Sequence, residues 1–193
     1  RINALYSIKK AGSGHIGTSF SCMDMVCWLY LNELRNPADQ DGQGPTDIFF
    51  SSKGHDVPAL YSVLIGLELL DFDLIHKLRR IDGLPGHPDV SVPYMHANTG
   101  SLGMGISKAK GMALANRLMG RSGQIYVLTG DGELQEGQIW EALQPAVNQG
   151  LGEITVIVDH NKLQSDTWVS EVSGLGDLEG RFGSFGWHVS RCN

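Results

Sequence analysis

The chain has 193 residues, of which 41% are hydrophobic and 19% charged, so it is long enough for one globular domain with a real core. Its formal net charge of −6 argues against a nucleic acid or an anionic membrane surface as a partner. The longest unbroken apolar run, at 25–31, is too short to cross a bilayer, and we find no secretory signal.

The cysteines and the chain ends give expectations about the cellular location of the protein and the extent of the domain. Cys22, Cys27 and Cys192 are an odd set without a CxxC spacing, which argues against a disulfide framework or a zinc site. We therefore expect a cytoplasmic location. We also expect one domain over residues 1–193 that is incomplete at both ends, because the chain opens on Arg1 and stops just after an apparent strand at 187–189.

Apolar runs separated by glycine, proline and polar residues predict alternating helices and strands. The first elements expected in chain order are a helix buried on most faces at 22–34, a polar loop at 36–46, a strand at 48–51, a helix from 56 to about 69, a second helix at 73–81, an irregular stretch at 82–99 and a helix at 106–118. Irregular stretches as long as 82–99 are usually functional in compact domains.

The next three elements form a strand–helix–strand unit. Residues 124–129 and 154–158 are β-branched, apolar strand candidates, and 137–149 between them has a helical pattern. A crossover helix between two buried strands makes them parallel, with the loops after both strands at one edge of the sheet. The sequence therefore predicts an α/β fold, a doubly wound parallel sheet with helices on both faces, that binds its ligand at this edge.

Polar residues follow both of these strands. Asp131 lies between Gly130 and Gly132 at the end of the first strand, and Asn161 follows the second, with 28 residues between Gly132 and Asn161. Carboxylate and amide oxygens suit Mg²⁺ or Ca²⁺, and the two glycines let the backbone approach a phosphate closely. A Gly-Asp-Gly triplet alone is a common turn, but its place in the strand–helix–strand unit favours a metal–diphosphate site.

These segments resemble the thiamine-diphosphate fingerprint of transketolases. Residues 129–137 read TGDGELQEG and residues 158–164 read VDHNKLQ. Four further motifs occur in the order that the family shows: SGHIG at 13–17, SSKGH at 51–55, LPGHPD at 84–89 and TGSLGMG at 99–105. The resemblance covers nearly the whole chain and is strongest to the amino-terminal subunit of split, two-chain transketolases.

The resemblance implies a set of ligands for the cofactor thiamine diphosphate and its cation. Asp131 and the Asn161 side chain would bind Mg²⁺ (or Ca²⁺), with the Leu163 carbonyl as the third protein ligand. Gly132 would donate its backbone N–H to the diphosphate, beside Gly130. One departure from the family is His160, which stands where a second acid is usual before Asn-Lys.

The resemblance also implies roles for three histidines that each follow a glycine in a loop. His55 would contact the diphosphate, His15 would lie at the reacting end of the substrate, and His87 would hydrogen-bond the substrate near the cofactor. Without the resemblance, an exposed turn histidine is the better interpretation of each. His96 lies in the irregular stretch and could line the site, while neither it nor His160 receives a role.

Three further family positions concern the rest of the cofactor. Gly100 and Leu102 would pack against its aminopyrimidine, and Glu136 resembles a family glutamate in a buried acidic link between paired sites. The family's glutamate that contacts the aminopyrimidine comes from a second domain or a partner chain, and nothing in this chain matches it.

Four other residues receive a structural interpretation. Glu133 is expected only to favour the N-terminus of its helix. Lys53 is either a phosphate contact or a solvated lysine, and the sequence does not decide between these. Trp28 and Trp140 are expected in the core or at an interface.

The resemblance implies a transketolase-type transferase that moves a two-carbon ketol unit from a ketose, expected to be a sugar phosphate, to an aldose. The partner would be a complementary pyrimidine-binding subunit or domain, in a homo- or hetero-oligomer. Two alternatives stay open: another thiamine-diphosphate enzyme, such as a 2-oxo-acid dehydrogenase first component or a deoxyxylulose-phosphate synthase, and a catalytically silent scaffold of the same fold. The sequence does not name the sugar.

Overall fold

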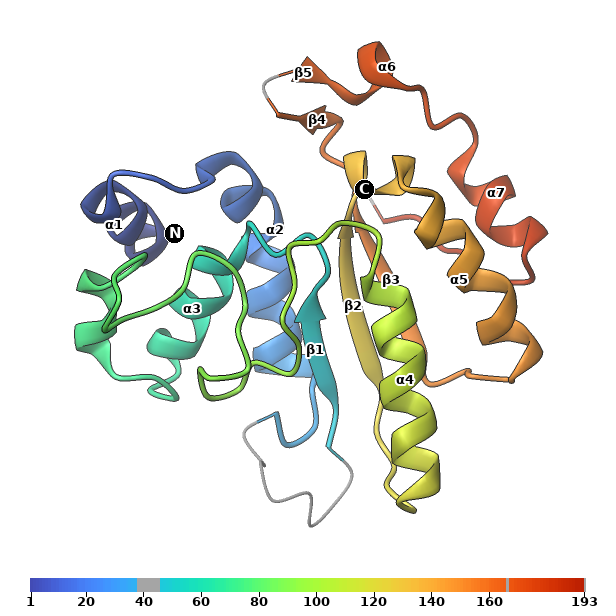
Figure 1. The fold of residues 1–193 in the computed structure, drawn as a ribbon, viewed down its shortest axis with the longest axis horizontal. Coiled ribbons are helices and arrows are strands. Elements are labelled where there is room, and N and C mark those ends of the chain that lie inside the picture. Colours follow the sequence, from blue (N-terminus) through green and yellow to red (C-terminus); the bar gives the residue numbers. More distant parts are fainter. Residues whose placement is uncertain (38–45, 166, 193) are drawn as a thin grey trace.

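A computed structural model describes residues 1–37, 46–165 and 167–192 (Figure 1). The helices are α1 (Ile2–Ala11), α2 (Ile16–Trp28), α3 (Val57–Gly66), α4 (Gly105–Leu118), α5 (Gly137–Asn148), α6 (Val169–Val172) and α7 (Leu178–Ser184). A π-helical segment η1 (Leu29–Glu33) continues α2, and two 3₁₀ segments are η2 (Phe72–His76) and η3 (Gly132–Gln135). The strands are β1 (Ile48–Ser51), β2 (Ile125–Gly130), β3 (Ile154–Asp159), β4 (Leu163–Gln164) and β5 (Thr167–Trp168).

The central sheet is parallel and runs in the order β1-β2-β3 within the described residues. Ile48 pairs with Ile125 at its start, and Gly130 pairs with Asp159 at its end. Because the strands are parallel and in register, their carboxyl ends all reach one edge of the sheet. The strand–helix–strand unit of β2, α5 and β3 is thus confirmed, and β4 and β5 form a small antiparallel hairpin just beyond that edge.

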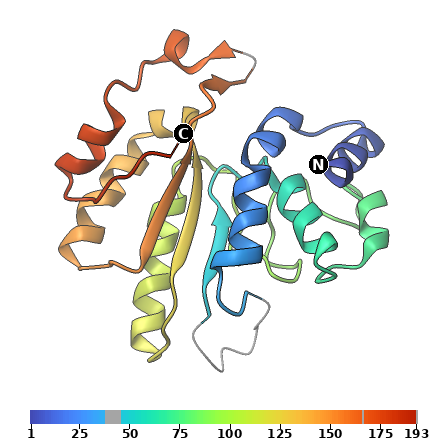
Figure 2. The same cartoon turned by 180° about the vertical axis from the view of Figure 1, so that it is seen from behind.

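Side chains alternate across the sheet and bury both of its faces. Phe49 and Leu128 pack with α1, α2 and α3 in one hydrophobic cluster. Their chain neighbours Phe50 and Val127 point to the opposite face and pack with Ala109 of α4 in a second cluster. Figures 1 and 2 accordingly show α4 and α2 on opposite sides of the sheet. The expected α/β fold with helices on both faces is confirmed.

Two expected helix boundaries in the first half are wrong. The helix that starts after Asp56 ends at Gly66 rather than near residue 69. The helix expected at 73–81 is the short segment η2 followed by a tight loop in which Leu78 pairs with Leu84. Arg79 has φ 58 within this loop, a left-handed conformation that a continuing helix cannot contain. The irregular stretch at 82–99 is confirmed, and the polar loop at 36–46 lies mostly outside the described residues.

The strand expected at 187–189 is wrong: this segment is irregular chain, where the Trp187 indole donates to the Leu143 carbonyl at 3.2 Å. Trp28 is 53% exposed, so of the two expected placements, core or interface, the interface is the one left for it. Trp140 does pack inside, where its indole donates to the Leu134 carbonyl and the Arg181 guanidinium lies 3.8 Å from the ring centroid. No helix among the described residues is long and apolar enough to cross a membrane.

Candidate cofactor site

The ends of β2 and β3 converge as the sequence predicts. Asp131 leaves β2 beside the Gly130–Asp159 pair, and its carboxylate accepts one hydrogen bond from the Gly132 N–H at 2.8 Å and another from the Lys162 N–H at 2.5 Å. Lys162 directly follows Asn161, so the two expected metal-binding residues stand on one rim of the sheet. A helical turn, η3, then begins at Gly132.

The Asp131 carboxylate is buried just beyond the end of β2. The residue is 1% exposed, and within the described parts of the chain no lysine, arginine or histidine forms an ion pair with it. Buried charges in proteins are ordinarily paired or bind a metal, because removing a carboxylate from water is costly. This carboxylate therefore suits a cation that comes from outside the chain.

Hydrogen bonds also fix the Asn161 side chain. Its amide nitrogen donates to the Ser21 hydroxyl at 3.3 Å and to the Asp159 carboxylate at 3.5 Å, while its carbonyl oxygen accepts the Leu163 N–H at 2.9 Å. The nitrogen is thus held toward α2 and β3. The second lone pair of the oxygen remains for a cation.

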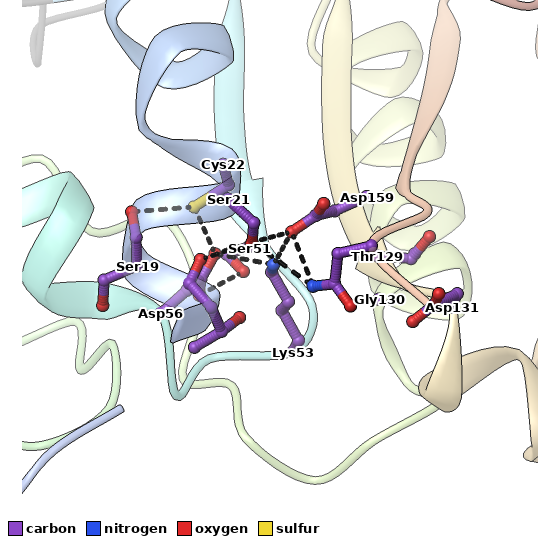
Figure 3. Close-up of polar contacts among 12 residues, drawn as sticks. Ser19, Ser21, Cys22, Ser51, Lys53, Asp56, Thr129, Gly130, Asp131 and Asp159 are labelled. Carbon is purple, nitrogen blue, oxygen red and sulfur yellow. Dashed lines mark hydrogen bonds and ion pairs between the residues drawn. The ribbon is translucent and has the colours of Figure 1, made fainter. Parts of the chain in front are cut away.

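Lys53 is buried in a charged cluster beside this rim (Figure 3). Its ammonium lies 2.6 Å from the Asp159 carboxylate and 3.8 Å from that of Asp56, and the side chain is only 2% exposed. Burial alone would lower the pKa of Lys53, but the neighbouring carboxylates outweigh it and raise that pKa above its usual value. The solvated interpretation of Lys53 is therefore wrong: its charge is already paired inside the protein.

Glu133 is a buried acceptor rather than an exposed helix-terminal charge, which corrects the sequence interpretation. It is 2% exposed, and its carboxylate accepts from the Ser52 hydroxyl at 2.5 Å, the Gly103 N–H at 2.8 Å and the Gly130 N–H at 3.2 Å. Burial raises the pKa of Glu133 even though these three donors lower it. The residue joins the ends of β1 and β2 to the start of α4.

The three candidate histidines gather near the carboxyl end of β1, which His55 follows by four residues. The rings of His15 and His55 meet edge to face, with centroids 5.0 Å apart. The backbone of Gly54 lies against Gly100, where a Cβ on Gly54 would be 2.6 Å from the Gly100 nitrogen. A Cβ on Gly100 would in turn be 2.6 Å from the His87 ring. His15, His55, Gly100 and His87 thus form one continuous group.

Burial lowers the pKa of both His55 and His87, with the Arg79 charge adding to the effect on His87. Burial also lowers the pKa of His96 in the irregular stretch. Imidazoles with lowered pKa values are neutral near pH 7 and can each accept or donate one proton there. His160 is exposed.

The remaining expected cofactor contacts lie at the surface of this chain. Leu102 is 39% exposed, and Gly103 packs against Glu136, whose Cβ lies 2.9 Å from the position of a Gly103 Cβ. Glu136 itself is exposed. Both side chains are therefore accessible to a ligand or a second chain.

Two observations test whether thiamine diphosphate fits these residues. Among the described residues, the buried side-chain oxygens that lack a partner are Thr99 Oγ1 and Gln164 Oε1. Thr99 precedes Gly100, and Gln164 lies against Gly132, so both fall where the cofactor is expected. The oxygen donors Asp131 and Asn161 suit a hard cation such as Mg²⁺. The residues present therefore fit a cation and a diphosphate.

Comparison with known proteins decides the family. The transketolase thiamine diphosphate binding domain matches residues 1–193, which is the whole chain. This chain belongs to the transketolase family. It is 38% identical to the 6-deoxy-6-sulfo-D-fructose transketolase subunit SqwG of Clostridium sp., over 96% of this chain and 68% of that subunit. It is 36% identical to an apulose-4-phosphate transketolase subunit of Phocaeicola vulgatus, over 96% of this chain and 66% of that one.

Single-chain transketolases align with the same region. Human transketolase is 34% identical over 98% of this chain but only 31% of its own length. The structure of transketolase from Leishmania mexicana superposes with a TM-score of 0.88 at 28% identity, covering 96% of this chain and 29% of that chain. The chain thus spans about two thirds of the subunit relatives and under a third of the single-chain transketolases. The expected transketolase resemblance, most like split two-chain members, is confirmed.

Within this transketolase domain, sequence reasoning missed two residues. The burial of Glu133 could not be predicted, because a glutamate just after a glycine also suits an exposed helix start. The position of Gln164 at the site could not be predicted, because its two-residue strand has no periodic pattern. A signal existed for both, since each lies within the fingerprint segments 129–137 and 158–164.

Proposed function

We propose that this chain binds thiamine diphosphate through a divalent cation and forms the diphosphate-side half of a transketolase active site. The enzyme would move a two-carbon ketol unit from a phosphorylated or otherwise anionic ketose to an aldose. The family membership supports the cofactor and the reaction type. The observation that carries the cation is the buried Asp131 carboxylate, which has no cationic partner in the described chain.

The cation would be Mg²⁺ or Ca²⁺, held by Asp131, the Asn161 side-chain oxygen and the Leu163 carbonyl. Among the described residues no group of three or more His, Cys, Asp or Glu side chains could hold a metal. A cation here would thus meet one carboxylate and neutral oxygens, and would need phosphate oxygens to complete its shell. Gly130 and Gly132 would let the backbone approach those phosphates, and the Gly132 N–H, which donates to the Asp131 carboxylate at 2.8 Å, would also have to meet a phosphate oxygen. Cation and cofactor should therefore bind together.

When bound, thiamine diphosphate supplies the carbanion chemistry that breaks and forms the carbon–carbon bond beside a ketone. His55 would contact the diphosphate, and His15 and His87 would face the substrate. At physiological pH, neutral His55 and His87 can accept a proton from a substrate hydroxyl and later return it. Gly100 and Leu102 would bound the aminopyrimidine.

A complementary pyrimidine-binding half would complete the site. The exposed Leu102 and Glu136 offer contacts to it, and Glu136 would take part in the acidic link between paired sites. The two subunit relatives are each named as one subunit of a transketolase, which supports a separate partner chain. A homo- or hetero-oligomer with the active site at the chain interface follows from this proposal.

The test is cofactor binding and ketol transfer by the full-length protein together with its complementary half. We expect calorimetric binding of thiamine diphosphate only when Mg²⁺ or Ca²⁺ is present, and transfer from at least one ketose of a panel of phosphorylated, sulfonated and branched sugars. Asp131→Ala should abolish both, whereas Glu141→Ala, on the exposed surface of α5, should change neither. Full cofactor binding by Asp131→Ala would overturn the cation site, and absence of any binding would favour a silent scaffold.

A further inference from the structure

Gln164 places a polar side chain against the glycine that would meet the diphosphate. It follows Leu163 in β4, and the β4–β5 hairpin holds its backbone opposite Thr167. A Cβ on Gly132 would lie 2.9 Å from both the Cβ and the Oε1 of Gln164. The side chain therefore folds back over Gly132 instead of pointing into solvent.

The Oε1 atom of Gln164 is buried and has no hydrogen-bond donor within the described residues. A carbonyl oxygen that loses water without gaining a donor lowers the stability of the folded state. Such an atom in a native protein needs an explanation, and an absent ligand is one. The nearest candidate ligand is the cation and diphosphate proposed for Asp131, Gly132 and Leu163.

We propose that the Gln164 carboxamide oxygen accepts a hydrogen bond from a water molecule on the bound divalent cation. This inference rests on the proposed function and adds a residue to its cation site. Phosphate oxygens are acceptors and cannot satisfy another acceptor, whereas the water that Mg²⁺ retains in protein sites is a strong donor. Gln164 would be a positioning residue that holds this water and, through it, the cation.

The unpaired Gln164 oxygen should make the unliganded protein less stable than a variant that lacks this oxygen. Gln164→Met keeps the length of the side chain and removes the unpaired oxygen, so it should leave the melting temperature without cofactor unchanged or raise it. The same variant should show a smaller rise in melting temperature when Mg²⁺ and thiamine diphosphate are added. A merely structural glutamine would give the opposite pattern, with a lower melting temperature in both states.

Cation affinity gives the second measurement. In the full-length protein with its complementary half, Mn²⁺ binding at saturating thiamine diphosphate can be followed by electron paramagnetic resonance. We expect Gln164→Met to weaken Mn²⁺ binding about tenfold, as is typical for residues that orient a metal's ligands. Gln164→Glu keeps an acceptor oxygen beside the cation and should bind Mn²⁺ within about threefold of the unaltered protein, or more tightly.

The control is Gln144→Met on the exposed side of α5, where the amide donates to the Asn148 side chain at 3.0 Å. It should change neither melting temperature nor Mn²⁺ affinity. A carboxamide turned the other way would donate to the diphosphate, and Gln164→Glu would then repel the cofactor and weaken its binding more than tenfold. That result, or unchanged Mn²⁺ affinity in Gln164→Met, would overturn the proposal. If Asp131→Ala also kept full affinity, the proposed function itself would fail.

Discussion

The ammonium of Lys53 lies 2.6 Å from the carboxylate of Asp159, a residue 106 positions away in the sequence. The two side chains are 2% and 9% exposed, so this is a buried ion pair. The stem of Lys53 passes beneath Gly130, whose Cβ position is 3.5 Å from the Lys53 Cδ. One side chain therefore spans the carboxyl ends of β1, β2 and β3 (Figure 3). Asp159 also accepts from Ser21 at 2.5 Å, which adds α2 to the same cluster.

Replacing Lys53 should destabilise the protein strongly. Lys53→Met leaves the Asp159 and Asp56 carboxylates buried without their cation, and breaking such a pair costs about 3–5 kcal/mol. Urea denaturation should show this loss as a lower midpoint at constant slope. The double variant Lys53→Met/Asp159→Asn also removes one of the two unpaired carboxylate charges, so it should regain part of the lost stability. Lys110→Met, a lysine of α4 outside this cluster, is the control, and an equal loss there would contradict the assignment.

The strand ends could be predicted from the sequence because their signal is local. Residues 124–129 and 154–158 are short apolar runs, and each is followed at once by the polar residue of the site. Parallel pairing then brings Asp131 and Asn161 to one rim, whatever the rest of the chain does. The histidine loops were placed through the family resemblance, and their contacts became visible only in the structure.

Long-range packing explains what the sequence could not predict. The segment 73–81 has apolar residues at Leu74, Ile75 and Leu78 that also suit a helix. Instead Leu84 returns to pair with Leu78, and Gly83 packs so tightly on Lys77 that a Cβ would lie 2.2 Å from its carbonyl oxygen. Likewise no residue near Lys53 in the sequence indicates that Asp159 would pair with it, so the burial of Lys53 could not be inferred.

Gly100→Ala should impair the site without unfolding the protein. The residue has φ +116, which side chains rarely adopt, and the added Cβ would lie 2.6 Å from the His87 ring. His87 must therefore move, and we expect kcat/KM for ketol transfer to fall at least about tenfold, because small displacements of positioned groups are costly in catalysis. Gly111→Ala, where α4 faces open space, should retain activity and gain stability of up to about 1 kcal/mol. Equal activity of the two variants would contradict the proposed role of His87.

The two neighbouring glutamates should behave differently when each is replaced by alanine. Glu133→Ala leaves the buried donors of Ser52 and Gly103 and the partly buried N–H of Gly130 without their acceptor, and each unsatisfied buried group costs about 1–3 kcal/mol. A loss of at least about 2 kcal/mol should appear in the free energy of unfolding. Glu136→Ala removes an exposed side chain and should stay within about 0.5 kcal/mol. The interpretation of Glu133 fails if both variants unfold at the same denaturant concentration.

Histidine protonation should reduce stability below neutral pH. The pKa values of His55, His87 and His96 are lowered from the ordinary value of 6.5, chiefly by burial. As pH falls below 6.5, the unfolded chain takes up these protons before the folded protein does, so the free energy of unfolding decreases. The decrease should continue until each folded-state pKa is passed.

NMR titration of the imidazoles, combined with denaturation at several pH values, checks the predicted effect of histidine protonation on stability. The three rings should titrate below pH 6.5 in the folded protein, and stability should rise with pH across that window. His96→Asn removes one of the three groups and should flatten the pH dependence between the folded pKa of His96 and 6.5, while His55 and His87 keep their titrations. A His96 ring that titrates above pH 6.5 would reverse the sign of this effect, because protonation would then favour the folded state.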